Sequence, residues 1–131
     1  MSFEVLTRIP DVDSYLRLRK ITGLSARSGK AAEIGLPNSL YAVIIKDQDK
    51  TIGMGRVVGD GGCNFEIVDI AVDPVYQGQG LGRIIMESIL DYLDQNAPEG
   101  AYVSLIGDVP AMYEKFGFKD CKPSLGMYRK Y

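Results

Sequence analysis

The chain has 131 residues, of which 46% are hydrophobic and 24% charged, and its net charge at pH 7 is −2. This length and composition predict a single globular domain over residues 1–131. The small negative charge gives no indication of a nucleic-acid partner, and no apolar run is long enough to cross a bilayer. The sequence contains no histidine, which excludes Ser-His-Asp and Cys-His catalysis and removes the commonest zinc ligand.

The two cysteines, Cys63 and Cys121, have no spacing typical of a metal site. The first residues, MSFEVLTRIPDVD, lack a charged start followed by an apolar stretch, so we expect no signal peptide. We therefore expect free thiols, a cytoplasmic location and no bound metal. A disulfide between the two cysteines is the less favoured alternative.

The first third of the chain predicts one strand and two helices. Apolar and polar residues alternate over Phe3–Ile9, which is typical of a strand. Asp11 is a suitable N-cap for a helix that extends toward Leu24. A short helix from about Lys30 and a loop over Gly35–Ser39 follow.

The middle of the chain predicts three strands joined by tight turns. Their sequences are rich in β-branched residues, and short polar or glycine-rich turns separate them. Consecutive strands with short turns form an antiparallel meander. The predicted strands are Leu40–Lys46, Thr51–Gly59 and Cys63–Asp73.

The last third predicts helices and strands in alternation. Apolar residues recur at helical spacing over Leu81–Ala97, and Ala101–Gly107 is again typical of a strand, so the two predict a right-handed parallel crossover. A short helix with Pro110 in its first turn ends before Gly117. Residues 119–131 can supply a closing hairpin.

Three glycines at alternate positions, Gly78, Gly80 and Gly82, lie in the stretch VYQGQGLGR between a predicted strand and a predicted helix. The first turn of a helix leaves backbone N–H groups unpaired, and the helix dipole adds positive charge there. Glycines let an anion approach this backbone closely, so the stretch favours a phosphate site over a tight turn that needs positive φ. The lysine of a nucleotide-triphosphate loop is absent, because Arg83 follows Gly82.

The order Gln77-Gly78-Gln79-Gly80-Leu81-Gly82 is similar to the Arg/Gln-x-x-Gly-x-Gly/Ala motif of the GNAT superfamily of N-acetyltransferases. The predicted order of elements and the late segment MYEKFGF also resemble this family. The resemblance implies an α/β (α+β) fold with a mixed, mostly antiparallel sheet of six to seven strands and about four helices. It also implies one parallel crossover and a splayed pair of strands that binds an acyl-CoA.

The resemblance further implies that acetyl-CoA is the co-substrate and indicates where it binds. Backbone groups of Ile70, Ala71 and Val72 would pair with the pantetheine arm. The diphosphate would bind over the glycine-rich turn, at Gln77, Gly78, Gln79, Gly80, Leu81, Gly82 and Arg83. Asp108 is the only candidate near the position where many members carry a cofactor-contacting asparagine.

Tyr113, in MYEKFGF, is the predicted general acid. A phenol has a pKa near that of a thiol, so it can donate a proton to the leaving sulfur, and the corresponding tyrosine in the family lies beside the CoA sulfur. Composition alone would favour a tyrosine packed in the core. The match to the family motif favours the catalytic role.

Glu66 is the predicted general base, because histone-acetylating members of the family carry a glutamate at this position. By alternation Glu66, Val68, Ile70 and Val72 share one face of a strand. A carboxylate on an otherwise apolar face is costly unless it is solvated or functional. Asp69, expected on the opposite face, is the rival, and ordered water could replace both.

The predicted reaction is the transfer of an acetyl group to a primary amine of a small molecule or peptide by direct attack in a ternary complex. The alternative is a non-catalytic module that binds or senses acyl-CoA. The loop over about Leu24–Ser39 carries both signs of charge and does not identify the acceptor. A homodimer is an expectation by analogy, with the C-terminal GMYRKY available to pair across an interface.

Overall fold

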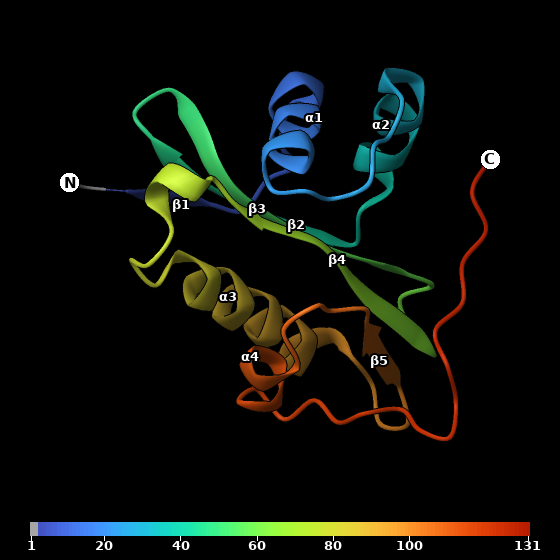
Figure 1. Ribbon diagram of the computed structural model, residues 1–131. Coiled ribbons are helices and arrows are strands. Elements are labelled where there is room, and N and C mark those ends of the chain that lie inside the picture. Colours follow the sequence, from blue (N-terminus) through green and yellow to red (C-terminus); the bar gives the residue numbers. More distant parts are fainter. Residues whose placement is uncertain (1–2) are drawn as a thin grey trace.

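The computed structural model describes residues 3–131 as one five-stranded sheet with helices on both faces (Figure 1). The strands lie in chain order across the sheet, and every neighbouring pair is antiparallel except the parallel pair of the last two. This is the predicted meander followed by a crossover. The strands are β1 (Glu4–Leu6), β2 (Tyr41–Asp47), β3 (Lys50–Gly59), β4 (Asn64–Val72) and β5 (Tyr102–Leu105).

The helices form two layers, one on each face of the sheet, as Figure 1 shows with α1 and α2 on one side and α3 and α4 on the other. Two short 3₁₀ turns accompany them. One of these turns occupies most of the predicted loop over Gly35–Ser39. The helical elements are α1 (Val12–Ile21), α2 (Gly29–Gly35), η1 (Leu36–Asn38), η2 (Pro74–Tyr76), α3 (Leu81–Asn96) and α4 (Pro110–Glu114).

Each face of the sheet has its own core, because strand side chains alternate between the faces. The α3 side is built from strand residues such as Val43 and Phe65 together with the apolar face of α3, including Ile85 and Ile89. The α1–α2 side is smaller and includes Leu18. Both helical predictions with apolar periodicity, for α1 and α3, are therefore confirmed.

Gly55 in β3 lets α3 approach the sheet closely. A Cβ added at Gly55 would lie 2.6 Å from Ile85 Cγ2 and 2.8 Å from Ile70 Cδ1. Both distances are shorter than any ordinary carbon contact, so only glycine fits there. The close approach fixes the height of α3, and with it the position of the glycine-rich turn at its N-terminus.

The sheet contains a β-bulge in β4 opposite Gly55. Ala71 pairs with Met54 and Val68 pairs with Arg56, so Asp69 and Ile70 both face one residue of β3. Asp69 has φ +61°, a left-handed conformation that aspartate tolerates better than most residues. The extra residue reverses the alternation of side chains beyond Val68.

The prediction of six to seven strands is wrong for the described residues, because no hairpin forms after α4. Residues 119–131 are exposed throughout and contain no regular element. Pro123 offers no backbone N–H to a sheet, and the segment runs away from the edge of β5 (Figure 1). Alternating residues form a strand only where a neighbouring edge supplies hydrogen bonds.

Two other properties of the described residues bear on function. None of the helices in residues 3–131 has both the length and the apolar character needed to cross a membrane. Within the same residues no group of three or more His, Cys, Asp or Glu side chains is placed to hold a metal ion. Cys63 and Cys121 are both free and exposed.

Candidate active site

The glycine-rich turn between η2 and α3 presents a run of unpaired backbone donors. Gly78 and Gly80 have φ +82° and +81°, a conformation that strongly favours glycine. In the part of the chain that the structure describes, none of the N–H groups of residues 78–83 donates to a protein acceptor. A Cβ added at Gly78, Gly80 or Gly82 would meet nothing within 4 Å, so the space around these residues is open. These donors, at the start of a 16-residue helix, suit an anion.

The side chains of the same segment mostly secure the loop instead of pointing into the open space. The Gln77 N–H donates to the Pro74 carbonyl at 3.3 Å, and Gln77 Nε2 donates to the Val72 carbonyl at 3.0 Å. Leu81 is buried in the α3 core. Arg83 Nε pairs with Glu87 Oε1 at 2.8 Å on the exposed surface of α3. The predicted diphosphate-binding residues, 77–83, thus lie together in one turn, and residues 78–83 offer backbone N–H donors there.

Asp73 fixes the start of this loop. Its Oδ1 accepts a hydrogen bond from the Val75 N–H at 3.0 Å, and its Oδ2 pairs with Arg17 and lies 3.8 Å from Lys50 Nζ. Burial opposes ionisation of Asp73, but the hydrogen bonds from Val75 and Arg17 and the nearby cations outweigh it, so its pKa is lowered. The buried carboxylate ties the loop to α1 and β3.

The strands β4 and β5 separate at the level of this turn. Their parallel pairing runs from Asn64 with Tyr102 to Ile67 with Leu105 and stops there. Ile70, Ala71 and Val72 lie beyond this point, so the edge of β4 is open where the sequence predicts contact with pantetheine. A parallel edge of this kind can accept an extended chain by backbone hydrogen bonds.

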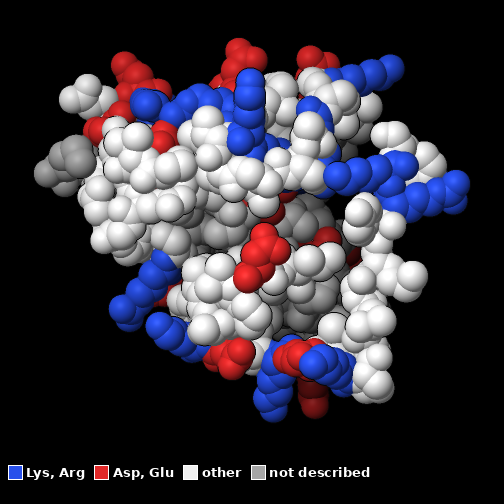
Figure 2. Space-filling model, in the orientation of Figure 1, with Lys and Arg blue, Asp and Glu red and all other residues white. Residues whose placement is uncertain are grey.

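A cavity of about 440 Å³ fills the gap between the separated strands, and we call it the splay cleft. Figure 2 shows this face of the molecule hollowed between its two layers. The cleft joins the glycine-rich turn to the predicted general acid, which are far apart in the sequence. Its lining includes Ile70, Ala71, Val72, Gln77, Gly82 and Tyr113.

Tyr113 in α4 is positioned by Gly107. A Cβ added at Gly107 would lie 2.3 Å from Tyr113 Cε2, so the ring fits only because Gly107 has no side chain. Burial and the nearby carboxylate of Asp108 raise the pKa of the Tyr113 phenol above its usual 10. The hydroxyl therefore stays protonated at neutral and mildly alkaline pH. The sequence predicts Tyr113, but nothing in the sequence pattern identifies Gly107.

Glu66 lies outside the splay cleft, in an adjoining cavity of about 740 Å³ between β4, the α1–α2 loop and the C-terminal segment. We call it the α1–α2 cavity. The two cavities share lining residues, including Leu24, Ile67 and Val68. Glu66 is half-buried and makes no ion pair or side-chain hydrogen bond within residues 3–131.

The bulge overturns the predicted face assignment in β4. Glu66 and Val68 line the α1–α2 cavity with Asp69, whereas Ile70 and Val72 pack against the α3 core. The extra residue at the bulge moves Ile70 and Val72 to the other face. Asp69 therefore lies on the same side as Glu66 and not opposite to it.

Asp69 is committed to a buried cluster that the sequence does not predict. Its carboxylate pairs with Arg19 and, at 2.8 Å, with Arg56 Nε, and it accepts a hydrogen bond from Tyr15 Oη at 3.0 Å. Only 6% of the Asp69 side chain is exposed. Asp69 is thus held by three donors from the protein, whereas Glu66 has no side-chain partner within residues 3–131.

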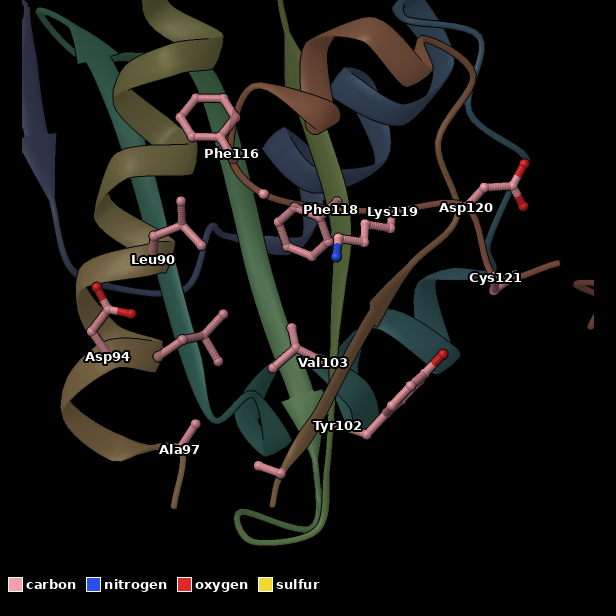
Figure 3. Close-up of a pocket in the computed structure, with 13 residues that line it drawn as sticks. Leu90, Asp94, Ala97, Tyr102, Val103, Phe116, Phe118, Lys119, Asp120 and Cys121 are labelled. Atoms are coloured by element: carbon pink, nitrogen blue, oxygen red, sulfur yellow. The ribbon is translucent and has the colours of Figure 1, made fainter. Parts of the chain in front are cut away.

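A third cavity, of about 660 Å³, contains none of the predicted site residues. It lies between α3, β5 and the segment after α4, and Figure 3 shows Leu90, Val103, Phe116 and Phe118 around it. Its walls are mostly apolar side chains from these three elements. The predicted site residues that line a cavity therefore lie in the splay cleft or the α1–α2 cavity, whereas the rest of the glycine-rich turn, from Gly78 to Leu81 and Arg83, lines neither.

A family model described as an acetyltransferase (GNAT) domain matches residues 37–120, which include the glycine-rich turn, the splayed strands and Tyr113. The chain belongs to the GNAT acetyltransferase family. The predicted family is thus confirmed, as is the mixed α/β sheet with one parallel pair.

Relatives in sequence and structure agree with this family. An uncharacterized N-acetyltransferase ycf52 from Pyropia yezoensis is 32% identical over 111 residues, which cover 81% of this chain and 64% of that protein. The chain thus spans a little under two thirds of that relative. A probable acetyltransferase of unknown function from meticillin-resistant Staphylococcus aureus is 50% identical with a TM-score of 0.94, over 99% of this chain and 100% of that one. The fold is also similar to Rv2747 from Mycobacterium tuberculosis in complex with CoA, at 19% identity and a TM-score of 0.75, over 93% and 76% of the two chains.

Proposed function

We propose that the protein is an acetyl-CoA-dependent N-acetyltransferase that acts on a primary amine of a small molecule or peptide, with residues 1–131 acting as one domain. The observation that carries the proposal is the run of unpaired N–H groups at residues 78–83, beside a cleft that Gly82 lines together with Tyr113. Membership of the GNAT family supports it. The CoA in the structure of Rv2747, a protein of the same fold, supports an acyl-CoA ligand.

The residues present fit acetyl-CoA. The open space around Gly78, Gly80 and Gly82 and the free donors suit a diphosphate, and the open edge of β4 at Ile70–Val72 suits the pantetheine arm. When bound, acetyl-CoA supplies an acetyl group activated as a thioester. Asp108 also lines the splay cleft, and whether it replaces the family's usual asparagine as a cofactor contact is part of the proposal.

Direct transfer in a ternary complex assigns one role to each remaining residue. An alkylamine has a pKa near 10 and must lose a proton before its nitrogen can attack the acetyl carbon. Glu66, which lines the α1–α2 cavity, accepts that proton from the amine directly or through water. The C–S bond then breaks, and the Tyr113 hydroxyl donates its proton to the leaving sulfur. The nitrogen becomes positively charged when it attacks and loses its second proton to solvent as the amide forms. Glu66 releases its proton to solvent and the tyrosinate takes one up, so each acetyl transfer from a protonated amine releases one net proton.

An assay of free-thiol release over a panel of primary amines tests this function. We expect thiol release that requires both acetyl-CoA and an amine. The Glu66→Gln variant should react at least tenfold more slowly than the wild type near neutral pH and should need a higher pH to reach the same rate. The control variant Glu99→Gln, at an exposed glutamate in the turn before β5, should keep the wild-type profile. Binding of acetyl-CoA without thiol release from any amine would support the alternative, a non-catalytic acyl-CoA sensor. An unaltered profile for Glu66→Gln would remove Glu66 as the base.

We further propose that the protein acts in the cytoplasm and as a homodimer. Exposed apolar side chains gather in the C-terminal part of the chain, at Ile106, Val109, Leu125, Met127, Tyr128 and Tyr131. Apolar groups that cluster on a surface favour association, and a symmetric pair of like surfaces is the commonest arrangement. Light scattering at micromolar concentration should give twice the mass of 14.4 kDa, and a monomer would contradict the dimer.

A further inference from the structure

The α1–α2 cavity carries more positive than negative charge, although the chain as a whole is negative. Its charged lining consists of two carboxylates and four cations, namely Glu66, Asp69, Arg19, Arg27, Arg129 and Lys130. Lys and Arg side chains gather beside the C-terminal segment in Figure 2. Charge of one sign in a concave site attracts a ligand of the other sign.

Part of the excess positive charge comes from the buried cluster around Asp69. Arg19 and Arg56 both pair with this one carboxylate, and within residues 3–131 neither pairs with another. The side chains of Arg19 and Arg56 are only 5% and 11% exposed. The cluster therefore holds one net positive charge away from bulk water, where its field is weakly screened.

Arg27 brings a second guanidinium group to the hydroxyl of Ser25, which Arg19 also contacts. Arg27 Nη1 donates to Ser25 Oγ at 2.8 Å and to the Ala26 carbonyl at 3.1 Å, and Arg19 Nη2 donates to the same Ser25 Oγ at 3.2 Å. No carboxylate in the described residues pairs with Arg27. Two guanidinium groups that meet at one hydroxyl repel each other, and an anion bound beside them would relieve that repulsion.

Glu66 is a second carboxylate in the lining of the same cavity. It lies on β4, next to the splay cleft, and has no cationic partner in residues 3–131. A ligand that extends from Arg27 to Glu66 would place an anionic group at one end and an ammonium group at the other. The amine end would then lie beside the cleft assigned to the acetyl donor.

We propose that the acceptor is a small amine that also carries a carboxylate or a phosphate, with Arg27 binding the anionic group. The role of this amine as the acetyl acceptor rests on the proposed function. The binding of an anionic amine in the α1–α2 cavity does not depend on it. A cavity of about 740 Å³ is large enough for a metabolite-sized ligand. Arg27 is then a specificity-determining residue, while the buried Arg19 positions Ser25 and adds to the field.

Matched pairs of amines test the proposal, because each pair differs only in its anionic group. The pairs are lysine against lysine amide and glucosamine 6-phosphate against glucosamine. We expect kcat/KM for at least one anionic member to exceed that of its neutral match by tenfold or more. Arg27→Gln should lower kcat/KM for the anionic member to that of its neutral match and so remove the preference, whereas Arg8→Gln, at an exposed cation outside the cavities, should leave the preference unchanged. Which pair shows the preference distinguishes a carboxylate from a phosphate.

A binding measurement separates this proposal from the catalytic one. Calorimetric titration of the same amines into the protein with bound CoA should show tighter binding of the anionic member, and Arg27→Gln should abolish the difference. If this preference is found without thiol release from any amine, the site stands and the proposed reaction is wrong. Equal affinity and equal kcat/KM within both pairs, or a preference that survives Arg27→Gln, would overturn the inference.

Discussion

Replacing Asp69 with alanine should lower the free energy of unfolding by about 3–5 kcal/mol. The change leaves the guanidinium groups of Arg19 and Arg56 buried without their shared carboxylate, and Tyr15 loses its acceptor. Such a loss is a large part of the roughly 5–15 kcal/mol that stabilises an ordinary domain. Urea unfolding followed by circular dichroism measures it, with Asp69→Asn as the milder variant if the alanine variant does not fold.

The control for Asp69 is an exposed ion pair in the same chain. Asp120 lies 3.7 Å from Lys122 at the surface, so Asp120→Ala should cost less than about 0.5 kcal/mol. A loss below about 1 kcal/mol for both Asp69 variants would show that the cluster does not hold α1 against the sheet. The buried positive charge that we assign to the α1–α2 cavity would then not depend on the ion pairs of Asp69.

Replacing Tyr113 with phenylalanine should lower kcat by about 10²-fold or more, with little change in the affinity for acetyl-CoA. The ring keeps its place against Gly107, and only the proton donor is lost. Since the pKa of Tyr113 is raised, the wild-type enzyme should keep its general acid as the pH rises through 10 and lose it only above that. Single-turnover thiol release across pH 7–11, compared between the wild type and Tyr113→Phe, measures both effects.

Tyr102→Phe is the matched control, because Tyr102 is exposed on β5 and lines a different cavity. It should leave kcat unchanged. If Tyr113→Phe turned over the true acceptor at the wild-type rate, another group would have to protonate the leaving sulfur. A weaker binding of acetyl-CoA with unchanged kcat would instead assign Tyr113 to cofactor binding.

Much of the fold follows from local patterns in the sequence. The period of the apolar residues predicts α3, and the cap at Asp11 predicts α1, whose Ser14 N–H donates to the Asp11 carboxylate at 2.9 Å. The Gln-x-x-Gly-x-Gly pattern predicts the turn before α3 because the positive φ of Gly78 and Gly80 is a local property of the backbone. The prediction for Tyr113 depends instead on the resemblance of MYEKFGF to the family motif.

The rest depends on contacts between distant segments, which a single sequence does not display. Strict alternation places Glu66 and Asp69 on opposite faces of β4, and only the bulge at Asp69, supported by Arg19 and Arg56, brings them together. The predicted closing hairpin over residues 119–131 fails for a similar reason, because a hairpin joins a sheet only where a neighbouring strand edge pairs with it, and within the described residues no such pairing forms. Gly107 is necessary only because the ring of Tyr113, from α4, packs directly against it.

Calorimetric titration of acetyl-CoA into the wild-type protein and into Gly82→Val tests the central claim most directly. Gly82 lines the splay cleft in the first turn of α3, and an added Cβ meets no protein atom within 4 Å. The variant should therefore fold normally. Gly29→Val, in the first turn of α2, is the control, since its Cβ also has open space.

We predict saturable binding by the wild type and the control, and at least tenfold weaker binding by Gly82→Val. No binding to the wild type at millimolar acetyl-CoA, or equal affinity in all three proteins, would contradict the assignment of residues 78–83 to the coenzyme diphosphate.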